Sequence, residues 1–118
     1  MDEETPMDEE TPVEKYLVID TRDPAANGRH YELAGGLADH GDDVTVYLVQ
    51  NAVLAVRSGS ASAPALRGVG GKARVVADEL SLRARAVTEQ ERIEEVSSRT
   101  IDGLVDALVD EDRKVLWL

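Results

Sequence analysis

Three polar segments of the sequence each follow a short apolar run, and they hold the groups best suited to bind a ligand. The candidate ligand-binding residues are Asp20, Arg22, Gln50, Asn51, Asp78, Ser81, Arg83 and Arg85. Arg83 and Arg85 are two residues apart and follow the hydroxyl of Ser81, and together with Arg22 they could hold an anion such as phosphate, sulfate or a carboxylate. Surface pairing of these arginines with nearby acids explains the same residues equally well.

Asp78 also has more than one interpretation. It could contact a ligand, it could be a solvated or arginine-paired acid at a strand end, or it could act in acid–base catalysis with an arginine. His30 and His40 are the only histidines, and their spacing does not place them on one helical turn. The sequence therefore predicts no metal site, and we assign no catalytic residue.

The 118 residues contain no cysteine. This excludes disulfides, thiolate catalysis, zinc–cysteine sites and iron–sulfur ligation by these residues. We expect no cofactor.

The formal net charge is -11 at pH 7, with 24 acidic residues against 13 Lys and Arg. An acidic surface argues against direct binding to nucleic acid or to an anionic membrane. The acidity favours a halophilic protein over an ordinary acidic protein with an acidic tail. No run reaches the roughly 18 to 20 apolar residues of a membrane span, and no signal peptide is recognisable, so we expect a cytoplasmic protein.

The chain divides into two parts. Residues 1–12 repeat the sequence MDEETP and carry six acids without a cation, which predicts a disordered acidic tail. Whether this duplication is native is open. Residues 13–118 are predicted to form a single domain, whose 18 remaining acids against 13 bases give it a charge of about -5.

Apolar runs predict buried strands at residues 15–20, 44–50, 74–78 and 114–118. Helical spacing predicts helices at residues 30–40, 65–69 and 101–110, and the capping box at Thr88 predicts a helical turn before a short edge strand at 93–96. Strands alternating with helices predict an α/β fold, a doubly wound three-layer sandwich with a mostly parallel sheet of four or five strands. The candidate residues should then gather at the carboxyl ends of the strands.

Smaller features carry further expectations. The predicted buried face of the helix at 30–40 consists of Leu33, Ala34, Leu37 and Ala38. Gly41 is the predicted left-handed cap of this helix. Gly35 and Gly36 suggest a close approach to the sheet. The apolar cluster of Val53, Leu54 and Val56 is either core or a subunit contact, and we expect a homo-oligomer.

The segments 41–53, 75–85 and 101–116 occur in the order and spacing that resemble the DsrE/DsrF/TusD family of sulfur-relay proteins. The resemblance covers residues 16–118. It implies a five-stranded parallel sheet and assembly into dimers, trimers or hexamers. In active members a cysteine after the third strand carries persulfide sulfur, and its place would fall near Asp78.

This sequence departs from that pattern, because a carboxylate cannot carry sulfane sulfur by thiol–persulfide exchange. The resemblance therefore implies a non-catalytic DsrE-like accessory subunit that binds a small ligand or a protein. The alternative is a subunit of a sulfurtransferase complex whose active cysteine comes from another chain. Implied partners are further copies of this chain, DsrE-family proteins or other sulfur-relay proteins.

Overall fold

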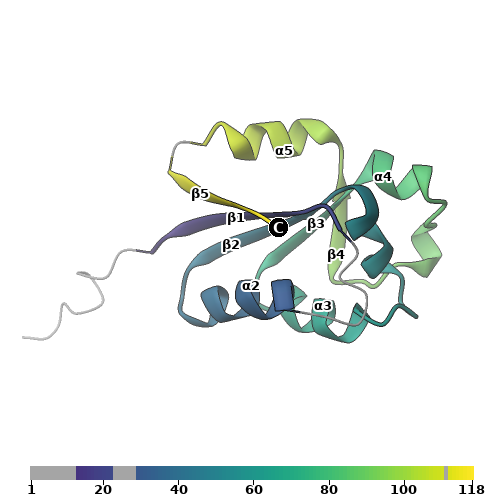
Figure 1. Cartoon of the computed structure of the whole chain (residues 1–118), viewed down its shortest axis with the longest axis horizontal. Coiled ribbons are helices and arrows are strands. Elements are labelled where there is room, and N and C mark those ends of the chain that lie inside the picture. The colour runs from purple at the N-terminus through teal and green to yellow at the C-terminus, as the bar shows by residue number, and fades with distance from the viewer. Residues whose placement is uncertain (1–12, 23–28, 111) are drawn as a thin grey trace, which may run out of the picture.

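The computed structural model describes residues 13–22, 29–110 and 112–118, which form one parallel sheet covered by helices on both faces (Figure 1). The sheet has five strands in the order β4-β3-β2-β1-β5, and every neighbouring pair is parallel. Helices α2 and α3 lie on one face and α5 lies on the other. The predicted α/β sandwich is confirmed, and the predicted acidic tail at residues 1–12 lies outside the described residues.

The strands are β1 (Lys15–Asp20), β2 (Asp43–Leu48), β3 (Arg74–Asp78), β4 (Val96–Arg99) and β5 (Arg113–Trp117). The bounds of β1 and β3 are those predicted from their apolar runs. The edge strand β4 begins at Val96, where the predicted strand ended. The predicted helical turn and capping box at Thr88 are confirmed by η2 (Glu89–Glu91).

The remaining helices are α2 (Arg29–Asp39), η1 (Gln50–Val56), α3 (Ala63–Gly70), α4 (Glu79–Ala84) and α5 (Ile101–Leu108). Gly41 ends α2 with a φ of 102°, as predicted for a left-handed cap. Leu33 is exposed, so the predicted buried face of α2 is wrong at that position. A Cβ at Gly35 would lie 4.0 Å from the Val69 side chain of α3, so this glycine faces a neighbouring helix where we expected it to face the sheet.

The apolar cluster after β2 belongs to the core. Val53 and Val56 are fully buried in η1, a 3-10 helix, and Leu54 is half-buried against the same core. The interpretation of these side chains as a subunit contact is therefore wrong. The sequence reasoning missed this helix because its apolar residues have no clear α-helical period.

The two faces of the sheet are covered unequally. The α2/α3 face carries the larger core, whereas the α5 face carries a smaller core built around Leu17, Tyr47, Val76 and Leu104. Helix α5 has the predicted amphipathic pattern, but Leu104 is its one buried apolar side chain. Strand β5 was predicted to be buried, but it is only partly buried, because it is an edge strand that pairs with β1 alone. Within the described ranges, no helix is long and apolar enough to cross a membrane.

Candidate functional site

The carboxyl ends of β1, β2 and β3 meet at one edge of the sheet, which we call the rim. The rim carries a cavity of about 550 Å³, the rim cavity. Its lining includes the polar residues Gln50, Asp78, Ser81 and Arg85. The predicted position of a site at the ends of parallel strands is thus the position of this cavity.

Asp78 and Ser81 form the base of this arrangement. Asp78 caps the amino end of α4, and its Oδ2 accepts hydrogen bonds from the backbone N–H of Ser81 at 3.0 Å and from the Ser81 hydroxyl at 2.7 Å. The backbone N–H of Gln50 donates to the Ser81 Oγ at 2.9 Å. One serine hydroxyl therefore joins the ends of β2 and β3.

The second carboxylate oxygen of Asp78 has no such partner. Asp78 is 5% exposed, and its Oδ1 is buried without a hydrogen bond from any described residue. An unmet buried acceptor costs about 1 to 3 kcal/mol, and more when it is charged. This oxygen is therefore the group at the rim with the strongest need for a donor from outside the chain.

Gln50 adopts a backbone conformation that is unusual for a side-chain-bearing residue. Its φ is 56°, in the left-handed region, where a non-glycine residue costs roughly 1 to 2 kcal/mol. This conformation lies where β2 turns into η1, at the residue whose N–H binds Ser81. Backbone strain of this kind is concentrated at functional sites in proteins.

Arg85 ties the rim together through neutral oxygens. Its Nε donates to the side-chain oxygen of Asn51 at 2.9 Å, its Nη1 to the Ser81 carbonyl at 3.3 Å, and its Nη2 to the Gln50 side chain at 3.5 Å. All three guanidinium nitrogens thus have partners within the chain. The arginine links η1 to α4 and is less free to capture an anion than its sequence position suggests.

Asp20 is placed beside the cavity but does not line it. Its side chain is fully buried, its Oδ1 accepts from the backbone N–H of Arg22 at 3.2 Å, and its Oδ2 lies 3.5 Å from the His30 Nδ1. Asp20 therefore organises the loop after β1. His40 pairs instead with Asp42 at 3.4 Å, so the two histidines have separate partners.

Two of the candidate arginines do not reach the rim cavity. Arg83 is exposed and pairs with Glu79 at 3.0 Å, while Arg22 is exposed and its backbone N–H donates to Asp20. The structure therefore brings Ser81 and Arg85 together without the other two guanidinium groups. No group of three or more metal-ligating side chains occurs in the part of the chain that the structure describes.

The apolar wall of the cavity was missed by the sequence reasoning. Leu80 is 68% exposed, Trp117 62% and Ile101 52%, and these three side chains line the cavity with the buried Leu104. The available signal was the Asp78–Ser81 spacing, which marks the start of a helix and places Leu80 in its first turn. Large exposed apolar side chains around a polar base are typical of a binding site.

Comparison with known proteins supports the fold. No family model matches the chain, and no curated protein sequence matches it. The YchN protein from E. coli has a similar structure, with a TM-score of 0.77, 18% identity, and coverage of 91% of this chain and 100% of that chain. MTH1491 from Methanobacterium thermoautotrophicum, a protein of unknown function, has a TM-score of 0.69, 17% identity and the same coverage of both chains.

These likenesses confirm the fold that the resemblance implied. Both proteins have the DsrE-like fold, and this chain shares it over nine-tenths of its length. At such low identity the likeness shows the fold alone. A role in sulfur relay does not follow from it.

Proposed function

We propose that this chain is an accessory binding protein that takes a small ligand at the rim cavity and performs no thiol chemistry of its own. Asp78 carries the proposal, because this residue lines the cavity and its buried Oδ1 has no donor among the described residues. The favoured ligand presents an N–H or O–H group to this oxygen. Its apolar part packs against Leu80, Ile101 and Trp117.

This ligand class differs from the anion considered from the sequence. Arg85 is held by three neutral oxygens, and Arg83 is paired with Glu79. The most poorly satisfied polar group is therefore an acceptor, so a donor or a cation gains more than an anion does.

Three small probes that share one aromatic ring distinguish a ligand that donates a hydrogen bond from an anionic ligand. Benzylamine offers a cationic donor, benzyl alcohol a neutral donor and benzoate an anion, and each is titrated while backbone amide chemical shifts are recorded. We expect affinity to fall in that order, with shifts at Gln50, Ser81 and Leu104. Tighter binding of benzoate than of benzylamine would overturn the proposal in favour of an anion site at Arg85.

Two matched variants test whether the preference for benzylamine depends on the Asp78 carboxylate. Asp78→Asn keeps the helix cap and replaces one acceptor by a donor, so it should abolish the preference for benzylamine. Glu79→Gln removes the same charge from the adjacent residue, which points to Arg83 and not into the cavity. The preference should survive in this control.

We also propose that the chain assembles into homo-oligomers through α5. Val105, Leu108 and Val109 lie at helical spacing and are exposed, with Val109 at 70%. A helix that buries Leu104 but exposes Ile101, Val105 and Leu108 gains stability when a second copy covers it. Light scattering of the purified chain should report a dimer or a larger closed assembly.

A second candidate function uses the same exposed apolar rim. Leu80 and Trp117 beside a polar cavity also suit a protein partner, and the fold is the one that sulfur-relay subunits use. In this case a cysteine from another chain supplies the thiolate. Mixing the chain with a cysteine-bearing DsrE-family protein should then increase persulfide transfer, whereas an unchanged rate counts against this function.

A further inference from the structure

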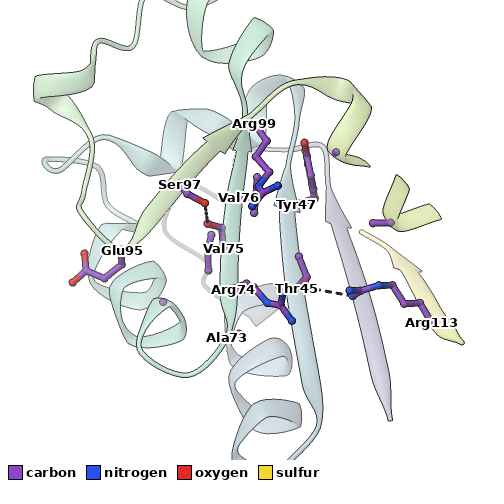
Figure 2. A pocket seen from close by; sticks show the side chains of 13 residues that line it. Thr45, Tyr47, Ala73, Arg74, Val75, Val76, Glu95, Ser97, Arg99 and Arg113 are labelled. Atoms are coloured by element: carbon purple, nitrogen blue, oxygen red, sulfur yellow. Dashed lines mark hydrogen bonds between the residues drawn. The ribbon is translucent and has the colours of Figure 1, made fainter. Parts of the chain in front are cut away.

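A second cavity of about 350 Å³ lies on the α5 face of the sheet, which we call the arginine cleft (Figure 2). Its floor is formed by β2, β3 and β4, and Gly103 and Ala107 of α5 contribute to its wall. None of its lining residues lines the rim cavity.

Three strands each contribute one arginine to the cleft: Arg74 from β3, Arg99 from β4 and Arg113 from β5. The register explains why they meet. Thr45 pairs with Arg74, and Val76 pairs with Ser97, so these side chains share one face of the pleated sheet. Figure 2 shows Arg74 and Arg113 on either side of Thr45, with Arg99 farther along the sheet beside Val76 and Tyr47.

The three guanidinium groups differ in how their charge is balanced. Arg74 pairs with Asp43 at 3.0 Å, and Arg113 lies 3.3 Å from Asp110. Arg99 has no acidic partner within ion-pair distance among the residues that the structure describes. Glu95 also lines the cleft, but Figure 2 shows its carboxylate pointing away from the arginines. The cleft therefore carries excess positive charge in a chain that is otherwise strongly acidic.

Space and hydrogen-bonding groups accompany this charge. A Cβ at Gly103 would lie 3.3 Å from both the Tyr47 hydroxyl and the Arg99 Cδ, so the glycine keeps the cleft open. Thr45 lies beside Arg113, whose Nη1 donates to its hydroxyl at 3.5 Å, and Ser97 adds a second hydroxyl. Guanidinium groups and hydroxyls are the side chains that proteins use to hold phosphate and sulfate groups.

We propose that the arginine cleft binds a small molecule through a phosphate or sulfate group, with Arg99 as its principal contact. Guanidinium groups from three strands suit a tetrahedral oxyanion, whose oxygens point in several directions, better than a planar carboxylate. The volume suits a small molecule. A polyanion such as nucleic acid is disfavoured because the chain carries a net charge of -11.

To test this proposal, inorganic phosphate, sulfate and acetate are each titrated into the full chain, and chloride keeps the ionic strength constant. Chemical shifts of the backbone amides and of the arginine Nε–H groups report binding. We expect saturable shifts at Ser97, Arg99 and Gly103 with phosphate and sulfate, and the tighter of the two identifies the group that the natural ligand carries. Shifts that chloride reproduces, or tighter binding of acetate, would overturn the proposal.

Variants then assign the site. Arg99→Gln should weaken phosphate binding about tenfold or more, since a charge-assisted hydrogen bond is lost. Arg67→Gln removes the same charge from α3 on the opposite face and should leave the affinity unchanged. Gly103→Ala keeps every charge but fills the cleft, and it should also weaken binding. Unchanged affinity in both Arg99→Gln and Gly103→Ala refutes the site, and circular dichroism confirms that each variant is folded.

Discussion

Replacing Ser81 by alanine tests whether the rim is held together as the structure indicates. The Ser81 hydroxyl donates to the Asp78 Oδ2 at 2.7 Å and accepts from the Gln50 backbone N–H at 2.9 Å. Loss of the bond to a buried carboxylate costs about 1.5 kcal/mol, and loss of the part-buried backbone bond about 1 kcal/mol. Alanine recovers roughly 0.5 kcal/mol through its higher helix propensity in α4. We therefore expect the free energy of unfolding to fall by about 2 kcal/mol.

Urea unfolding followed by far-ultraviolet circular dichroism measures this loss. A domain of this size has an m value of about 1 to 2 kcal/mol per molar urea, so the midpoint should fall by about 1 to 2 M with an unchanged slope. Ser58→Ala is the control, because Ser58 is exposed and only its backbone N–H bonds, to the Glu91 carbonyl. A difference between the two variants below about 0.5 kcal/mol would refute the claim that one hydroxyl joins β2 to β3.

Three further predictions concern other parts of the molecule. Burial and, after it, the negative charge of Asp78 raise the pKa of Tyr47 above its ordinary value, and this effect outweighs the opposite effects of Arg99 and of the Leu104 backbone N–H. In a titration followed by ultraviolet absorbance, the Tyr47 phenol should therefore lose its proton at a higher pH than an exposed tyrosine does. The stability that this phenol contributes is complete below pH 10 and is lost as the pH rises through its folded pKa, and Tyr47→Phe should remove that loss. Gly41→Ala should destabilise by about 1 kcal/mol in thermal unfolding, because alanine is strained at a φ of 102°. Val105→Lys should reduce the mass measured by light scattering, and an unchanged mass would contradict assembly through α5.

Most of the sheet could be predicted from the sequence because its central strands, β1, β2 and β3, are largely buried. The strands at 15–20 and 74–78 are continuous apolar runs that end at an aspartate, and they have the predicted bounds. Such runs identify strands by composition alone. The position of the candidate site followed from the same reasoning, since parallel strands place Gln50 and Asp78 at one edge.

The details of the site could not be predicted because they depend on side-chain partners. Arg83 and Arg85 look equivalent in the sequence, yet one lies 3.0 Å from Glu79 one helical turn away and the other crosses to Asn51 at 2.9 Å. Which arginine faces the rim depends on the bounds of α4, a helix of six residues that has too few turns to show a period. Trp117 likewise looked like core until the sheet order placed its strand at an edge.

The two cavities on the α5 face are related through one pair of neighbouring residues. Asp78 and Arg99 are register partners on β3 and β4, so their side chains leave the same face of the sheet. Asp78 nevertheless lines the rim cavity, whereas Arg99 lines the arginine cleft. The two proposed sites thus each use one member of a pair of oppositely charged side chains that are neighbours in the register of β3 and β4.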